Sequence, residues 1–358
     1  MLSLNIIKVL FPSAFSFLFG ILIAPFIAKI LYKKELWKKK SVSMTIDGRE
    51  ATISSKLHND EAKKTPRLGG IVIWLSVFVT ALSLWLLSKL FPTDATTKFD
   101  FISRDQTWLP LFAMLVGAIV GGIDDLLVVG FFKKQGSYIG GGLSFPIRLL
   151  TVGCIGLFAG FWFYEKLGIQ TVFVPFYGQL SLGLLYIPFF VITTVALFST
   201  SVIDGIDGLS GGIFATVFTS VGIITFLHNQ INIATLCFVI VGAILGFLWF
   251  NVPPALFYMS ETGILALTLA LSVISFMADI TLYLPLIAFP LFATSLSVIM
   301  QLLSKKYRGG KKIFLVAPLH HHYEAKGWSR STITMRYWIV SCMCALMGIV
   351  LVLVTYVQ

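Results

Sequence analysis

Apolar runs of about twenty residues recur along the whole chain, and they constrain its fold more than any other feature. A run of that length crosses the hydrocarbon core of a bilayer as a single α-helix. Only 12% of the residues are charged, against about 25% in an ordinary soluble domain. The sequence therefore predicts an all-α integral membrane protein with about ten transmembrane helices, forming a single polytopic membrane domain over residues 1–358. The expected spans are roughly 6–31, 69–91, 109–131, 147–165, 181–200, 208–227, 232–250, 263–281, 283–303 and 334–357.

Lys and Arg residues alternate between the connections of these spans, and the alternation predicts the orientation. Segments 33–67, 132–148 and 303–336 hold ten, three and eight Lys or Arg residues. Cytoplasmic connections carry such an excess, so these segments are expected in the cytoplasm and both termini outside. The net charge of +11 then reflects orientation and attraction to anionic membrane lipids. Nucleic-acid binding is the weaker interpretation, because the charge is confined to connections that flank the membrane.

Five carboxylates lie inside or at the ends of the apolar runs, and all five fall on connections expected in the cytoplasm. They are Asp124, Asp125, Asp204, Asp207 and Glu261. An ionised side chain at bilayer depth costs roughly 2.5–3.5 kcal/mol, so such groups are usually functional. Acids gathered on one water-facing surface indicate a divalent cation, and with it a polyanionic substrate.

Each acidic motif also has a plain structural interpretation. Asp124 and Asp125 can bind a hydrated cation, or one can act as a general base, but the pair can also cap a helix end that faces water. Asp204 and Asp207 would share one face of a helix, beside glycines that let a ligand approach closely. They can equally form an N-capping turn between two helices, and both alternatives remain open from the residues alone.

Segment 251–263 contains two adjacent prolines, which predict an ordered loop rather than a helix at the membrane face. Asn251, Tyr258 and Glu261 offer an amide, an aromatic ring and a carboxylate. Such a set can stack and hydrogen-bond a nucleobase while reaching a metal ion. Glu261 can instead act near the N-terminus of the following helix, as an ordinary helix-dipole partner.

Basic and imidazole side chains that suit phosphate oxygens lie in two further segments. They are Lys63, Lys64 and Arg67 before the second span, and His320, His321 and His322 in the last basic connection. The first group can cradle phosphate beside a Gly-Gly helix start, or it is ordinary flanking charge. Three successive histidines cannot all point one way, so a zinc site is a poor interpretation. Segment 169–180 alternates well enough to predict a small periplasmic β-hairpin.

Together and in this order, the motifs resemble the phospho-N-acetylmuramoyl-pentapeptide transferases of the polyprenyl-phosphate N-acetylhexosamine-1-phosphate transferase superfamily. The most specific stretch is 317–328, APLHHHYEAKGW, and segment 247–251 is also close to the family pattern. The resemblance implies Mg²⁺-dependent transfer of phospho-MurNAc-pentapeptide from UDP-MurNAc-pentapeptide to undecaprenyl phosphate. The products would be lipid I and UMP, in the peptidoglycan synthesis on which cell shape and division depend. It also implies ten transmembrane helices in the bacterial plasma membrane, a cytoplasmic active site and often a homodimer.

The resemblance assigns roles to individual residues. Asp124, Asp125 and Asp204 match catalytic acids, and Glu261 matches the residue that ligates magnesium. The residues expected to bind substrate include the basic segment before the second span. They are Lys63, Lys64, Arg67, Arg148, Asp207, Asn251, Tyr258, His320, His321 and His322. The resemblance places the Asn251 amide and the Tyr258 ring at the uracil, and the three histidines near the diphosphate.

The chain departs from the family pattern at several positions. Val128 stands where a Lys follows the acidic pair, Glu261 where the metal ligand is Asp, and Arg67 where Thr is usual. The extra methylene of Glu261 moves its oxygens by about one bond length, and small geometric errors can cost roughly 10²-fold in rate. Two alternatives therefore stay open: a sister transferase that uses another UDP-HexNAc, and a catalytically impaired scaffold or transporter of the same fold.

Overall fold

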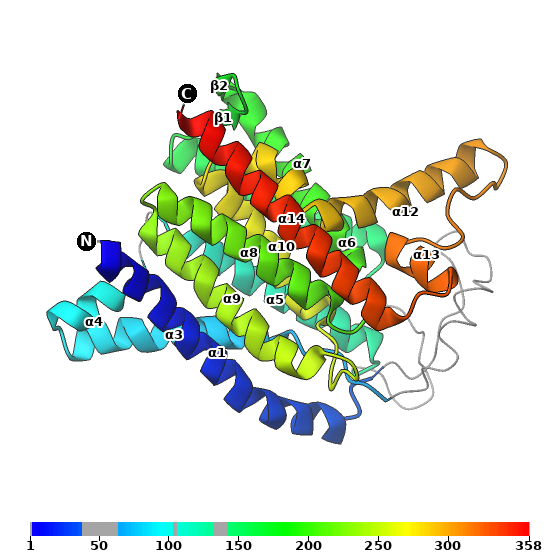
Figure 1. Ribbon diagram of the computed structural model, residues 1–358, viewed down its shortest axis with the longest axis horizontal. Helices are drawn as coiled ribbons and strands as arrows, with labels where there is room; N and C mark the ends of the chain where they lie inside the picture. Colours follow the sequence, from blue (N-terminus) through cyan, green and yellow to red (C-terminus); the bar gives the residue numbers. More distant parts are fainter. Residues whose placement is uncertain (1, 38–63, 103–105, 132–141, 358) are drawn as a thin grey trace.

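The computed structural model describes residues 2–37, 64–102, 106–131 and 142–357, most of which are helical (Figure 1). Lys63, one of the expected phosphate-binding residues, lies outside the described residues. The long helices are α1 (Leu2–Lys33), α3 (Ile71–Leu90), α5 (Trp108–Val128), α6 (Phe145–Lys166), α7 (Tyr186–Ser199), α8 (Leu209–Leu227), α9 (Ile231–Asn251), α10 (Ser260–Met277), α12 (Phe289–Tyr307) and α14 (Arg330–Val357). The short elements are α4 (Asp94–Phe99), α11 (Leu284–Ile287), α13 (Leu319–Ala325), β1 (Thr171–Val174), β2 (Gly178–Ser181) and three 3₁₀ turns at Gly183–Leu185, Thr200–Ile203 and Thr281–Tyr283.

Nine of the described helices are long and apolar enough to cross a membrane, or ten when one bent pair is counted as a span. This confirms the predicted polytopic all-α membrane protein. The bent pair joins Thr281–Ile287 to α12 at an angle of 85°, so the prediction of one continuous span over 283–303 is wrong. Pro290 accounts for the break, because it cannot donate a backbone hydrogen bond and its ring clashes with the preceding turn, whereas Pro285 lies inside the first segment. The helix α12 therefore projects away from the bundle (Figure 1).

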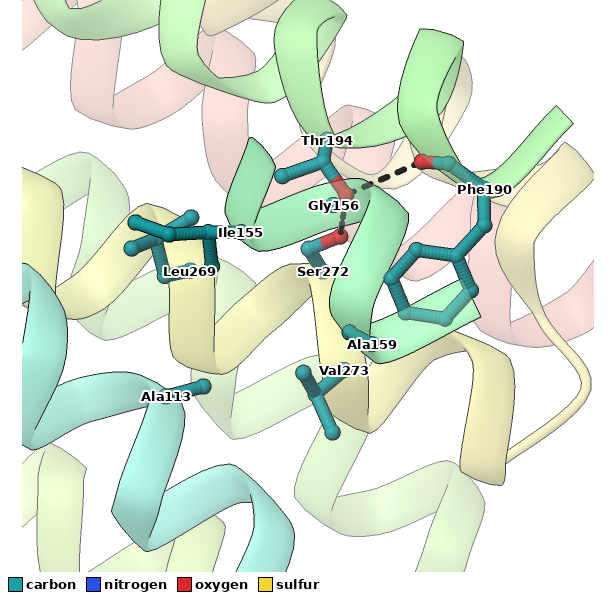
Figure 2. Close-up of a pocket in the computed structure, with 9 residues that line it drawn as sticks. All are labelled: Ala113, Ile155, Gly156, Ala159, Phe190, Thr194, Leu269, Ser272 and Val273. Carbon is teal, nitrogen blue, oxygen red and sulfur yellow. Dashed lines mark hydrogen bonds between the residues drawn. The ribbon is translucent and has the colours of Figure 1, made fainter. Parts of the chain in front are cut away.

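The innermost spans are α8, α9 and α10, whereas α6 and α14 expose much of their apolar surface. A cavity of about 10 Å³ lies between α5, α6, α7 and α10 (Figure 2). Thr194 and Ser272 share a hydrogen bond of 2.8 Å at its wall. A space of that size holds at most about one water molecule. It is far too small for the sugar nucleotide that the sequence resemblance implies.

The expected β-hairpin is present, with β1 paired antiparallel to β2 and Thr171 opposite Ser181. Asp279, just after α10, fastens the hairpin to the helical bundle. Its carboxylate accepts a hydrogen bond of 2.9 Å from the backbone N–H of Phe173 and a second from the side-chain amide of Gln179. The hairpin therefore packs at the end of the bundle where α10 finishes.

Both chain termini lie at the end of the bundle that carries the hairpin (Figure 1). At the opposite end α5 finishes while α8 and α10 begin. We call this second end the acidic end, because the five acids singled out from the sequence all lie there. Their arrangement agrees with the charge alternation, which puts the acidic connections opposite the termini.

Candidate active site

Helices α5 and α10 touch backbone to backbone, and this contact sets the geometry of the acidic end. Gly117 and Gly121 are four residues apart, so they face α10 together. A methyl group at Gly117 would lie 2.5 Å from the carbonyl oxygen of Leu265, and one at Gly121 would overlap the carbonyl group of Glu261. Residues without a side chain permit this approach. It brings the last turn of α5, with its acidic pair, against the first turn of α10.

Asp125 is fully buried at this contact, and both of its carboxylate oxygens have partners. Oδ2 accepts a hydrogen bond of 2.9 Å from the backbone N–H of Thr262, in the first turn of α10. Oδ1 accepts from the guanidinium of Arg67, whose Nε and Nη2 each lie 3.0 Å away. First-turn amides have no partner inside their own helix. Asp125 therefore caps a neighbouring helix while its charge is balanced by Arg67.

Arg148, in the first turn of α6, bridges the other two acids of this contact. Its Nη1 lies 3.0 Å from Glu261 Oε1, and its Nη2 lies 3.4 Å from Asp124 Oδ2. The Leu143 carbonyl accepts a hydrogen bond of 2.9 Å from Arg148 Nε and so fixes the plane of the guanidinium. Leu143 N–H donates to Asp124 Oδ1. Among the described residues, three carboxylates and two guanidinium groups thus gather here, one more acidic group than basic.

Two carboxylate oxygens in this cluster could turn to a cation, Asp124 Oδ2 in exchange for its 3.4 Å ion pair with Arg148 Nη2. Asp124 Oδ2 and Glu261 Oε2 are buried and accept no hydrogen bond from the described residues. Within the described ranges no three His, Cys, Asp or Glu side chains converge closely enough to hold a metal by themselves. Mg²⁺ ordinarily takes one or two carboxylates and completes its octahedron with water and substrate phosphates. The donor set therefore fits Mg²⁺ bound together with a phosphate ligand.

Asp204 and Asp207 lie in a turn between the 3₁₀ segment Thr200–Ile203 and α8, not on a helix. They consequently point apart. Asp204 turns toward α10 and accepts hydrogen bonds of 2.9 Å from Ser260 N–H and from Ser210 Oγ–H. Burial raises the pKa of Asp204, while these two hydrogen bonds act in the opposite direction. The Asp207 carboxylate instead accepts from the backbone of the proline loop, so the turn joins two parts of the acidic end.

The proline loop at 252–259 supplies the aromatic side of the site, and its lack of helix confirms the sequence prediction. The Asn251 amide is buried at its base, where Oδ1 accepts from Gly208 N–H at 3.0 Å and Nδ2 donates to the Phe257 carbonyl at 2.8 Å. Asn251 thereby ties the acidic turn to the loop. Tyr258 is half-buried; burial, followed by the nearby Asp207 charge, raises the pKa of its phenol.

The histidines lie on α13, and the structure confirms that they do not point the same way. His322 Nδ1 accepts a hydrogen bond of 3.1 Å from Leu315 N–H. His320 is buried, and its Nε2 lies beside that of His321 over Gly205, in the turn between the two acids. A methyl group at Gly205 would lie 2.8 Å and 2.9 Å from these two nitrogens. Two imidazoles therefore face the acidic turn at close range.

The structure also shows what the sequence analysis did not find. Lys64 is exposed and its Nζ lies 5.9 Å from the centre of the Trp37 ring, so it is not drawn into the carboxylate cluster. The partners missed by the sequence analysis are Ser210, Ser260, Thr262, Glu324 and Arg330. The two first-turn residues of α10 could have been found, since unpartnered N–H groups at a helix start require acceptors.

Comparison with known proteins identifies the family of this chain. The glycosyl transferase family 4 model matches residues 107–279. A phospho-N-acetylmuramoyl-pentapeptide-transferase of Chlorobium phaeobacteroides is 36% identical over 307 residues, which are 78% of this chain and 77% of the relative. Those of Chlorobaculum tepidum and Chloroflexus aurantiacus are 34% and 30% identical, over 78% and 81% of this chain and 77% of each relative. With this similarity along most of its length and a polytopic helical fold, the chain belongs to the phospho-N-acetylmuramoyl-pentapeptide-transferase family of transferases.

Proposed function

We propose that the protein transfers phospho-MurNAc-pentapeptide from UDP-MurNAc-pentapeptide to undecaprenyl phosphate, forming lipid I and UMP. The acidic end then faces the cytoplasm of the bacterial plasma membrane, and both termini lie outside. The observation that carries the proposal is the contact of Asp124, Asp125 and Glu261 with two guanidinium groups at one end of the bundle. Such a site suits two anionic reactants, one soluble and one held by its lipid tail in the bilayer.

A single in-line displacement is the step that this geometry supports. An oxygen of the lipid phosphate attacks the sugar-linked phosphorus of the diphosphate, and the bond from that phosphorus to the UMP oxygen breaks. Asp125 is a poor nucleophile because it is buried and both of its oxygens are already bonded. A covalent phosphate on Asp125 is therefore disfavoured. Asp124, whose Oδ2 is held only by the 3.4 Å ion pair with Arg148, orients the attacking phosphate in this proposal.

Asp124 and Glu261 are the residues that would hold Mg²⁺. When bound, the ion would polarise the diphosphate and neutralise the charge that develops on the departing UMP. The Arg148 guanidinium would be displaced from Asp124 and Glu261 by the ion, which frees this cation to offset phosphate charge. Arg67 stays paired with Asp125. His320 and His321 offer ring nitrogens to phosphate oxygens above the acidic turn. Tyr258 lies on the same side as Asp207 and provides the aromatic surface for the uracil.

Substrate choice is tested by release of UMP from purified protein in detergent with undecaprenyl phosphate. UDP-MurNAc-pentapeptide should give UMP in parallel with lipid I, whereas UDP-GlcNAc should give at least about tenfold less. Faster release from UDP-GlcNAc would instead assign the protein to a sister transferase reaction. Absence of lipid-linked product from either nucleotide would reject the proposed activity.

Replacing Arg148 with glutamine is expected to expose competition between the guanidinium and the metal. Without Mg²⁺, loss of the charged hydrogen bonds to Asp124 and Glu261 should destabilise the variant by about 1–3 kcal/mol. Added Mg²⁺ should then raise the melting temperature of Arg148→Gln more than that of wild type. In the variant the ion does not have to displace the Arg148 guanidinium from the two carboxylates. Lys166→Gln, at the other end of α6, is the matched control and should behave as wild type. Equal Mg²⁺-induced shifts in all three proteins would argue against this competition.

A further inference from the structure

The helix α12 buries polar side chains and exposes apolar ones, which is the reverse of the pattern in a water-soluble protein. The buried polar side chains, spaced three or four residues apart along one face, are Thr294, Ser297, Gln301 and Ser304. The exposed apolar side chains include Leu296, Ile299, Met300 and Leu303. Since α12 also projects away from the bundle (Figure 1), its apolar surface lies against the acyl chains of the bilayer.

The chain after α12 folds back onto the buried polar face of this helix, and one side chain holds it there. Gln301 Oε1 accepts hydrogen bonds of 3.0 Å from the backbone N–H groups of Ile313 and Phe314. Gln301 Nε2 donates to the Phe314 carbonyl at 2.9 Å. Three backbone groups of the returning segment thereby find partners on α12, and the segment has a fixed position beside the helix.

The reversal that precedes this segment is also a defined structure. Gly309 and Gly310 have φ angles of 59° and 84°, in the left-handed region that glycine adopts without strain. Ser304 Oγ–H donates to the Lys311 carbonyl at 2.9 Å, and the same Oγ accepts from Arg308 Nη1 at 3.4 Å. These bonds fix the backbone of residues 306–312, which we call the basic turn.

The basic turn presents four exposed cations, which are Lys306, Arg308, Lys311 and Lys312. Within the described part of the chain none of the four is paired with a carboxylate, and the sequence has no Asp or Glu from residue 280 to residue 323. Tyr307 is 74% exposed among them, and Lys306 Nζ lies 5.4 Å from the centre of its ring. A tyrosine and basic side chains next to an apolar helix surface are typical of the boundary between membrane and water.

We propose that the basic turn binds the headgroups of anionic phospholipids in the leaflet that borders the acidic end. The turn leads into α13, which packs over the acidic turn and so places both on the same side of the membrane. Four or more Lys and Arg residues next to a membrane helix attract anionic headgroups, and each cation adds to the attraction. The apolar side of α12 contacts the tails of the same lipids. The bound lipid is a bilayer phospholipid rather than a reactant, so this binding does not depend on the proposed transfer.

Native mass spectrometry of the full chain in a neutral detergent measures binding of phosphatidylglycerol and phosphatidylcholine, which differ in headgroup charge. Wild type should bind phosphatidylglycerol at least about tenfold more tightly than phosphatidylcholine. The triple variant Lys306→Gln/Lys311→Gln/Lys312→Gln should bind phosphatidylglycerol at least about tenfold more weakly than wild type. Arg308 is kept because it bonds to Ser304 in the turn. The substituted side chains are exposed, so the variant should keep the wild-type melting temperature.

A second triple variant separates the basic turn from the ordinary charge that flanks membrane helices. Lys29→Gln/Lys33→Gln/Lys34→Gln removes three exposed cations near the end of α1, on the same side of the membrane (Figure 1). Its phosphatidylglycerol affinity should stay within about twofold of wild type, because the basic turn is intact. Equal losses in the two triple variants, or no loss in the first, would overturn the proposal.

The variant Gln301→Ala tests the fixed geometry of the basic turn without removing a charge. It releases the backbone of Ile313 and Phe314 from α12, so phosphatidylglycerol affinity should fall about threefold although every cation remains. Unchanged affinity in this variant would contradict the role assigned to the fixed backbone.

Undecaprenyl phosphate has the same phosphate chemistry, and transfer kinetics separate it from phosphatidylglycerol. At saturating phosphatidylglycerol the first triple variant should show the wild-type KM for undecaprenyl phosphate in lipid I formation. A raised KM together with unchanged phosphatidylglycerol affinity would assign the basic turn to the acceptor lipid and refute the proposal. If wild type makes no lipid I, the proposed function fails while the phospholipid affinities still decide the role of the basic turn.

Discussion

Replacing Gly121 with alanine should destabilise the protein by about 3 kcal/mol or more and abolish most of its activity. The added methyl group would overlap the backbone carbonyl of Glu261, and backbone atoms cannot step aside as a flexible side chain can. α5 and α10 would have to separate. That movement would pull Asp124 and Asp125 away from the first turn of α10. Thermal unfolding and lipid I formation measure the two consequences in the same preparation.

The neighbouring glycine offers a matched control. A methyl group at Gly122 would meet only the Thr262 hydroxyl, at 3.5 Å, which is an ordinary van der Waals distance. Alanine also favours helix over glycine by up to about 1 kcal/mol. Gly122→Ala should therefore be as stable as wild type or slightly more stable. Equal melting temperatures for the Gly121 and Gly122 variants would show that the α5–α10 contact is looser than described.

Breaking the pair between Asp125 and Arg67 is the second change with a large expected effect. Asp125→Ala leaves a partly buried guanidinium and the Thr262 N–H without their acceptor, which should cost about 3 kcal/mol. We also expect transfer activity to fall by roughly 10²-fold or more, since the acidic cluster loses both charge and alignment. Denaturant or thermal unfolding gives the first number and lipid I formation the second.

A double-mutant cycle separates the pair from its surroundings. Arg67→Ala, Asp125→Ala and the double variant should show a coupling of about 1–3 kcal/mol, because the double variant removes both partners and leaves neither of them unpaired. The Thr262 N–H remains unpartnered in both proteins that lack Asp125, so its cost cancels from the coupling. Additive losses would mean that the two side chains do not interact energetically.

The fold was largely predictable because its main determinants are local. Run length and hydropathy predicted the helices, and alternation predicted the hairpin at Thr171–Val174 and Gly178–Ser181. The bend before α12 was missed although Pro285 and Pro290 were visible. The apolar composition continues unbroken through both prolines. A hydropathy profile gives the length of an apolar segment, but it does not show whether the helix bends within it. Deciding between a kinked span and a broken one requires the packing of neighbouring helices.

The gathering of the five acids was predictable from the sequence, whereas their pairing with basic residues was not. Charge alternation placed the acids on one face, and they do gather at one end of the bundle. Arg67 and Arg148 were expected to bind phosphate, but in the structure both lie on carboxylates. Which opposite charges meet depends on contacts between residues 24 to 113 positions apart, and local spacing does not carry that information. The contact between His321 and Glu324 is different, because a three-residue spacing on a helix indicates it directly.

Mg²⁺ titration of lipid I formation tests the central claim most directly, with wild type compared against Asp124→Asn and Glu261→Gln. Each substitution removes a carboxylate charge with little change in volume. Wild type should make no product in EDTA and should recover fully with Mg²⁺, while both variants should require at least about tenfold more Mg²⁺ for half-maximal rate. Product formation by wild type that is equally fast in EDTA and in Mg²⁺ would contradict the account.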